Sequence, residues 1–266
     1  MPTLTEDPVT PVPRRVSPVA PASTPRPTPP VLSRDLRRVV VLDPGHGGTD
    51  GGTVAGKSLE KQLNLDASHR VAKRLKAAGY RVVFTREDDK YLTLAKRAEI
   101  ANRFPGAIFV SIHHNASTVS GPRGVETYFT GVKPSSVRGI QRRRFGLDSK
   151  DRFSDSRGEL LAKHIQKTFC IATGADDRGI KDRPLAVTRQ VSCPAVLVEC
   201  GFLSNPTERK KLGSNSYRDK MSAGIASGIV DFLNEVKSDA YYGVTIRRSG
   251  DENSSLADAQ PANEGS

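Results

Sequence analysis

The chain has 266 residues, with 41 lysines and arginines against 29 aspartates and glutamates, which gives a formal net charge of +12. This length suffices for one domain of about 200 residues with tails, and no apolar run approaches the roughly 20 residues that a membrane span requires. The charge favours anionic partners, but no helical pattern combines a basic stripe with aromatic residues, so we expect no nucleic-acid partner.

Residues 1–35 form a proline-rich segment that includes Pro25-Arg-Pro-Thr-Pro-Pro30. This composition is typical of an extended, semi-rigid tether, and we expect it to be disordered. The segment lacks the apolar centre of a secretory signal, which leaves open that an export signal was trimmed ahead of it.

After the tether, strand patterns alternate with helical patterns, which is typical of an α/β fold with a mainly parallel sheet and helices on both faces. The predicted strands are Val39–Asp43, Arg81–Thr85, Ile108–His113, Val125–Phe129, Leu185–Thr188 and Ala195–Glu199. The predicted helices are Leu59–Ala78, Thr93–Arg103, Ser156–Thr173 and Tyr217–Val236.

Two segments lack such patterns. Gly131–Asp155 is basic and irregular, and we expect an exposed loop there. Beyond Ser238 the chain is polar without a core pattern, so we predict a single folded domain over residues 36–237 and a largely disordered tail over 238–266. The cysteines, Cys170, Cys193 and Cys200, lack metal-type spacing; a disulfide between the last two is possible in principle, but we expect free, mostly buried thiols.

Three polar residues stand at or just beyond the carboxyl ends of predicted strands, namely His46, His113 and Glu199. Because parallel strands bring these ends to one edge of the sheet, the three can converge, and Glu60 joins them from the start of the following helix. Two imidazoles and a carboxylate suit a catalytic zinc site with one position open to water. The carboxylate that is not a ligand would then act as general base and acid.

Each of these residues also has a purely structural interpretation. His46 taken alone could be a hydrogen-bonded loop residue, and Glu60 could be a helix N-terminal carboxylate that the helix dipole favours. Glu199 is harder to explain in this way, because an unpaired carboxylate after Ala-Val-Leu-Val is costly to bury. We assign surface or packing roles to the remaining histidines, His69, His114 and His164.

These residues belong to a series of motifs that follow one another along Arg38 to Val236. The motifs are Leu-Asp-Pro-Gly-His46-Gly-Gly, Glu60-Lys-Gln-Leu-Asn64, Val-Phe-Thr85-Arg86, Arg97 with Ala101-Asn102, Phe-Val-Ser-Ile-His113-His-Asn-Ala, Gly124-Val-Glu126, Arg178-Gly-Ile-Lys181 and Pro194-Ala-Val-Leu-Val-Glu199-Cys-Gly-Phe-Leu-Ser-Asn205. In this order and spacing the chain resembles the zinc-dependent N-acetylmuramoyl-L-alanine amidases, which cut bacterial peptidoglycan.

The resemblance implies a mixed, mostly parallel six-stranded sheet flanked by helices, with the metal at the carboxyl edge of the strands. It implies that His46, Glu60 and His113 bind one Zn²⁺ per chain and that Glu199 is the catalytic carboxylate. The implied reaction is hydrolysis of the amide between N-acetylmuramic acid and L-alanine of the stem peptide. We also expect Asp43 or Asn115 to orient the ligand side chains, as outer hydrogen-bond partners do at metal sites.

The resemblance further implies peptidoglycan or its muropeptide fragments as substrate and a periplasmic or secreted location. It leaves open an activating division protein as a partner, which the basic loop could meet, and we expect a monomer. Some family members carry a helical insert whose glutamate plugs the metal site. Here Thr127 to Gly158 contains no glutamate, so we hypothesise an open site; plugging by Asp148, Asp151 or Asp155 is the alternative.

Three rival interpretations remain. Gly51-Gly-Thr-Val-Ala-Gly56-Lys57-Ser58 satisfies the pattern of a phosphate-binding loop, although it does not leave its strand directly. Ser58-Leu-Glu-Lys61 matches the Ser-x-x-Lys of penicillin-sensitive serine enzymes, but no Lys-Thr-Gly accompanies it. A non-catalytic wall-binding module would need a broken ligand set, and none of the four expected groups is missing.

Overall fold

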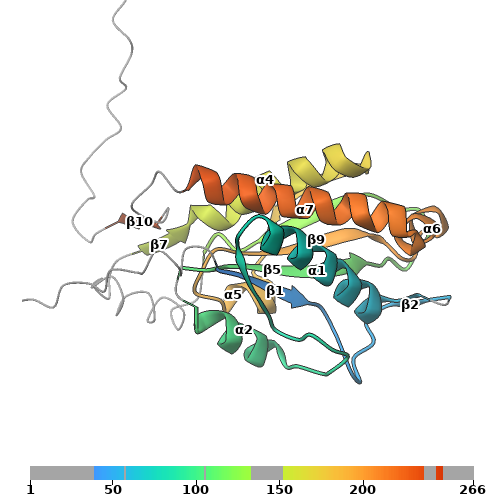
Figure 1. Cartoon of the computed structure of the whole chain (residues 1–266), viewed down its shortest axis with the longest axis horizontal. Coiled ribbons are helices and arrows are strands. Elements are labelled where there is room, and N and C mark those ends of the chain that lie inside the picture. Colours follow the sequence, from blue (N-terminus) through green and yellow to red (C-terminus); the bar gives the residue numbers. More distant parts are fainter. Residues whose placement is uncertain (1–38, 57, 105, 133–151, 237–243, 248–266) are drawn as a thin grey trace, which may run out of the picture. The chain divides into compact units, whose positions relative to one another are not determined.

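The structure is a computed structural model, and it describes residues 39–56, 58–104, 106–132, 152–236 and 244–247. Its main element is a six-stranded sheet in the order β4-β1-β5-β9-β6-β8 (Figure 1). The strands are β1 (Val39–Pro44), β4 (Arg81–Phe84), β5 (Ile108–Asn115), β6 (Val125–Phe129), β8 (Asp177–Asp182) and β9 (Ala195–Phe202). Strands β4, β1, β5 and β9 run parallel, whereas β6 is antiparallel to β9 and parallel to β8. The expected mixed, mostly parallel sheet is therefore confirmed.

Helices cover both faces of this sheet (Figure 1). On one face lie α1 (Glu60–Ala77), α4 (Ser156–Thr173) and α7 (Asn215–Glu235), and on the other lie α2 (Leu94–Asn102) and α5 (Ala186–Arg189). Strand β1, which lies between β4 and β5, is buried along its whole length, and this explains its apolar sequence. Strand β5 alternates, so that Val110 packs under the first helix group and Phe109 under the second.

Helices α4 and α7 approach each other closely at two glycines of α7. A Cβ added at Gly228 would lie 2.5 Å from the Ile165 Cα, and one at Gly224 would lie 2.7 Å from the Phe169 Cα. Real Cβ atoms do not reach such distances from backbone, so these positions require glycine despite its low helix propensity.

Gly228→Ala should therefore lower the free energy of unfolding by about 1–3 kcal/mol, because the added methyl overpacks a backbone contact. Urea unfolding measures this change. Gly213→Ala is the matched control, since a Cβ there meets nothing within 4 Å at the end of helix α6 (Pro206–Gly213). An equal loss in both variants would show that the close approach of the helices is not the cause.

The prediction of a strand at Leu185–Thr188 is wrong. These residues enter the short helix α5, and the sixth strand is β8, which lies just before them. Strand β8 has the sequence Asp-Arg-Gly-Ile-Lys-Asp and is mostly exposed or half-buried at the sheet edge, so its sequence lacks an apolar signal. Helix α6 was also not predicted. The other predicted strands and helices are confirmed, with ends that differ by up to a few residues.

Small strands lie outside the main sheet. Val54–Ala55 (β2) and Ser58–Leu59 (β3) form a hairpin in the glycine-rich loop. Arg152–Asp155 (β7), at the end of the predicted loop, pairs with Val244–Arg247 (β10), inside the predicted tail. The tether, most of the basic loop and most of the tail lie outside the described residues. Within the described part of the chain, no helix is both long and apolar enough to cross a membrane.

The three cysteines are not joined to one another by disulfides in the structure. Cys193 and Cys200 are buried and Cys170 is half-buried, as expected. Burial also raises the pKa of the Cys200 thiol, which keeps it protonated and unreactive.

Candidate metal centre

The site begins at the loop that follows β1. Its residue His46 has a left-handed backbone (φ 58°), a conformation that costs a non-glycine residue roughly 1–3 kcal/mol. Gly45 must be glycine, because a Cβ there would lie 2.2 Å from the His113 ring. The Pro-Gly-His-Gly-Gly sequence therefore ends the strand and lets the two histidine rings approach, with centroids 4.9 Å apart.

Two buried arginines hold this loop. Arg97 donates to the His46 carbonyl at 2.7 Å and to the Asp43 carboxylate at 2.7 Å. Arg86 donates to the carbonyls of Pro44 and Gly45 at 2.9 and 2.8 Å. The two arginine side chains thus donate hydrogen bonds to the backbone carbonyls of the loop. These bonds hold His46 in its strained conformation.

Arg97→Met should lower the free energy of unfolding by about 3–5 kcal/mol, because it leaves Asp43 buried without its cation. The control is Lys96→Met, which breaks an exposed pair with Glu99 and should cost less than about 1 kcal/mol. Equilibrium unfolding of both variants makes the comparison. If Arg97→Met were no more harmful than Lys96→Met, the loop would not depend on this pair.

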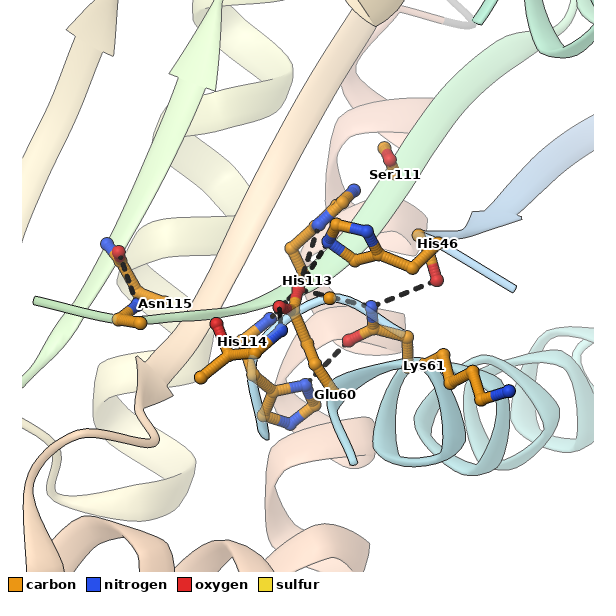
Figure 2. A network of polar contacts seen from close by, with 12 residues as sticks. His46, Glu60, Lys61, Ser111, His113, His114 and Asn115 are labelled. Atoms are coloured by element: carbon orange, nitrogen blue, oxygen red, sulfur yellow. Dashed lines mark hydrogen bonds and ion pairs between the residues drawn. The ribbon is translucent and has the colours of Figure 1, made fainter. Parts of the chain in front are cut away.

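Three of the predicted residues meet at one point (Figure 2). One oxygen of Glu60, Oε1, lies 3.1 Å from His46 Nε2 and 3.1 Å from His113 Nδ1. All three potential ligand atoms lie within 4.8 Å of one another. Two ligands of a tetrahedral zinc, each about 2.1 Å from the ion, are about 3.4 Å apart, so the two distances from Glu60 Oε1 are close to this spacing and the group could hold a metal ion.

The electrostatics of the cluster also fit a cation. Burial opposes ionisation of Glu60, but its contacts with His113 and His46 hold the pKa of its carboxyl well below the usual range. The hydrogen bond to Glu60 raises the pKa of His46 to about 9. A carboxylate that raises the pKa of a neighbouring imidazole also attracts a divalent cation. The cation and the protons then compete for the same ring nitrogens.

Other residues orient the three side chains. Asp50 contacts His46 Nδ1 at 2.8 Å and so leaves Nε2 to face Glu60. The second oxygen of Glu60 accepts from the Thr53 amide at 2.9 Å. Asn64, one turn along α1, donates to the Gly45 carbonyl and, at 3.4 Å, to Glu60 Oε1.

The expectation that Asp43 or Asn115 would orient the ligands is wrong. Asp43 instead binds Arg97, Thr85 and Ser111 beneath the loop, and Asn115 donates to Glu126. Sequence reasoning missed Asp50, for which the available signal was a carboxylate four residues beyond a loop histidine.

Glu199 faces the same cavity from the neighbouring strand, where it pairs in register with His113. The cavity measures about 350 Å³, and its lining is His46, Gly52, Thr53, Glu60, His113, His114, Asn115, Ala116 and Glu199. Oxygen Oε2 of Glu199 is buried and has no hydrogen-bond partner among the described residues. Burial raises the pKa of Glu199 to about 7, so this side chain can take up and release a proton near neutral pH.

The other histidines have structural surroundings. His114 is buried against Asn64, at 2.7 Å, and burial lowers its pKa to about 4, so its ring is neutral. His164 contacts Glu235 at 2.7 Å, and His69 lies 3.2 Å from the Glu87 carbonyl. Their assignment to packing or surface roles agrees with these contacts.

The contacts of the described residues argue against the rival motifs. Most of the phosphate-loop pattern is taken up by the β2–β3 hairpin, and Lys57 lies outside the described residues. Lys61 donates to the Gly48 carbonyl at 2.8 Å and to Asp89 at 2.7 Å, so its ammonium is directed at this loop and not at Ser58.

Two imidazoles and a carboxylate lie beside a second carboxylate, whose Oε2 has no partner among the described residues, at the edge of an α/β sheet. This is the set of groups found in the sites of metal-dependent hydrolases. Comparison with known proteins narrows this class. A family model described as N-acetylmuramoyl-L-alanine amidase matches residues 40–231. The chain therefore belongs to the N-acetylmuramoyl-L-alanine amidase family, whose members are peptidoglycan hydrolases, and the resemblance seen in the sequence is confirmed.

Individual relatives agree with this assignment. The amidase LytC of Bacillus subtilis (strain 168) is 32% identical over 193 residues, which are 73% of this chain but only 35% of LytC. YqiI of the same strain, an uncharacterised protein, is 35% identical, over 74% of this chain and 86% of its own length, and shows the sequence similarity alone. The catalytic domain of CwlV from Bacillus (Paenibacillus) polymyxa var. colistinus superposes with a TM-score of 0.63 at 35% identity, over 74% of this chain and 98% of that domain.

Proposed function

We propose that this chain hydrolyses the amide that joins N-acetylmuramic acid to L-alanine of the stem peptide, with one zinc ion bound by His46, Glu60 and His113. The observation that carries the proposal is the convergence of three ligand atoms within 4.8 Å, beside the unpartnered Oε2 of Glu199. Family membership supplies the bond that is cut, and the geometry supports these roles for the residues.

Zinc, when bound, supplies Lewis acidity toward a water molecule and toward the carbonyl oxygen of the substrate. Glu199 takes a proton from the attacking water as the new carbon–oxygen bond forms at the lactyl carbonyl. It then gives that proton to the L-alanine nitrogen as the carbon–nitrogen bond breaks. A carboxyl whose pKa is near 7 suits both transfers.

Digestion of purified sacculi, with and without a chelator, tests this proposal. We expect the untreated protein to release stem peptides with a free L-alanine amine and to leave glycan strands intact, as mass analysis would show. Chelation should stop the release, and added zinc should restore it. Cleavage within the glycan, or release that a chelator does not affect, would contradict the proposal.

We also propose that the protein acts on the wall outside the cytoplasm, in the periplasm or after secretion, as a monomer whose site is open. One matched structure is the CwlD amidase from Clostridioides difficile in complex with the GerS lipoprotein, at 28% identity, so some relatives associate with a partner. The cavity that the described residues form beside Glu199 supports an open site; residues 133–151 lie outside this described part. Inactivity of the pure, zinc-loaded protein until a partner is added would contradict this.

For the domain organisation we propose a catalytic domain over residues 36–237, between the proline-rich tether 1–35 and the tail 238–266. The six strands and their helices all lie inside this range. Limited proteolysis should first remove the tether and the part of the tail beyond Arg247, because Val244–Arg247 pairs with β7. Rapid cleavage inside the range, with the flanks intact, would contradict the assignment.

A further inference from the structure

The candidate metal centre continues as a row of polar side chains across the sheet. His113 of β5 is in register with Glu199 of β9, and Glu199 is in register with Glu126 of β6. The next strand, β8, pairs with β6 through Val125–Asp177 and Thr127–Ile180, so its register shifts at Glu126. This irregularity places Arg178 of β8 beside Glu126. Because residues in register share a face of the sheet, the row leads from the reacting centre to the β8 edge.

Glu126 is buried at 2% exposure and has four side-chain partners. It accepts from Tyr128 Oη at 2.5 Å, from Asn115 Nδ2 at 2.9 Å and from Arg178 Nε at 2.8 Å. Lys181 is the fourth partner, through an ion pair. Two cations thus meet one carboxylate, and the cluster retains one positive charge.

This positive charge is accessible to a ligand. The side chain of Arg178 is 37% exposed and that of Lys181 is 31% exposed, whereas Glu126 is covered. The Arg178 guanidinium lies 4.9 Å from the centre of the Phe202 ring, which limits its movement. Only its Nε is engaged by the described residues, so both terminal amino groups are able to hold a second carboxylate in a bidentate manner.

The cations also lie at a definite distance from the reacting centre. Neighbouring strands are about 4.8 Å apart, so β8 is roughly 10 Å from Glu199, and an extended peptide covers that distance in about three residues. Asn115, which borders the cavity and donates to Glu126, connects the two places. In Figure 2 it lies on the opposite side of His113 from His46.

We propose that Arg178, assisted by Lys181, binds a free carboxylate of the stem peptide about three residues beyond the amide that is cut. Through this contact, Arg178 and Lys181 make the protein favour stem peptides with a free carboxylate over stem peptides without one. This inference rests on the proposed function, because that function places the scissile amide between His113 and Glu199. The alternative is that Arg178 only neutralises Glu126 and supports the strand beside Glu199.

Two synthetic muramoyl peptides distinguish these roles, one with free stem carboxylates and one with the same carboxylates converted to amides. The zinc-loaded wild type should prefer the acidic substrate in kcat/KM by about ten- to a hundredfold, the range of a charge-assisted hydrogen bond. Arg178→Gln should remove most of this preference, mainly through KM, with a much larger loss of kcat/KM for the acidic substrate than for the amidated one. Arg178→Lys should keep part of the preference.

The matched control is Lys163→Gln, which removes one positive charge from an exposed pair with Glu159 on α4. It should keep the full preference. If Arg178→Gln slowed both substrates equally, or if the wild type showed no preference, the subsite would not exist. Should Arg178→Gln fail to fold, Lys181→Gln tests the same site, with a smaller expected loss of preference.

Calorimetric binding of the free stem peptide, acidic or amidated, gives a readout that does not need turnover. The wild type should bind the acidic peptide more tightly by a similar factor, and Arg178→Gln should bind both equally. If the zinc-loaded wild type cut neither substrate, the proposed function would fail while this measurement still decided the subsite. Equal binding of both peptides by the wild type would overturn the subsite alone.

Discussion

Glu199→Gln should lower kcat by about 10²–10⁴-fold, the usual contribution of a positioned general acid–base group. Glutamine keeps the size of the side chain but cannot carry the proton from water to the leaving amine. The protein should still fold and bind zinc, because Oε2 of Glu199 accepts no hydrogen bond from the described residues and Glu199 is not among the three clustered ligands. Release of L-alanine amines from sacculi measures kcat, and elemental analysis measures the zinc content.

The free energy of unfolding of Glu199→Gln serves as the control, because it shows whether the variant loses activity through loss of structure. Burial disfavours the charged form of Glu199, so a neutral glutamine should leave the free energy of unfolding unchanged or raise it. Turnover within threefold of the wild type would show that another group moves the proton. A loss of zinc together with activity would show that Glu199 acts as a ligand.

His113→Ala should abolish zinc binding at micromolar metal and reduce hydrolysis to the background rate. The variant removes one of the three ligand atoms and leaves the buried Glu60 carboxylate with His46 as its only imidazole partner. Calorimetric titration of the chelator-treated variant with zinc, run beside the hydrolysis assay, tests both expectations.

His69→Ala is the matched control, because His69 lies outside the cluster and, among the described residues, its ring contacts a backbone carbonyl and the Phe84 ring. It should bind one zinc and keep wild-type activity. Zinc binding by His113→Ala with wild-type affinity would remove His113 from the ligand set.

The sequence was sufficient to predict most of the sheet, for a physical reason. Strands such as β1 and β9 are buried on both faces and therefore have continuous apolar sequences that few other structures produce. Edge strand β8 is half-exposed and lacks that signal, so the strand was assigned to Leu185–Thr188 instead. The apolar and β-branched residues there are buried by a helical turn, which a four-residue window cannot distinguish from a strand.

The same limit applies to the site. His46, His113 and Glu199 could be expected to converge because they lie at or just beyond the ends of adjacent parallel strands, and the structure brings them and Glu60 to one cavity. The proposed division into three metal ligands and one catalytic carboxylate is implied by the family resemblance. The residues that hold these four groups in place could not be predicted from the sequence. Asp50 acts through a left-handed loop conformation, and Arg97 reaches its carbonyls from α2, so both contacts depend on tertiary geometry that no spacing in the sequence encodes.

Stepwise addition of zinc to the chelator-treated protein, with hydrolysis of sacculi followed at each step, tests the central claim most directly. We predict that the release of L-alanine amines rises in proportion to zinc, reaches its maximum at one ion per chain, and is absent from the metal-free protein. Full hydrolysis by protein that elemental analysis shows to be free of metal would contradict this account.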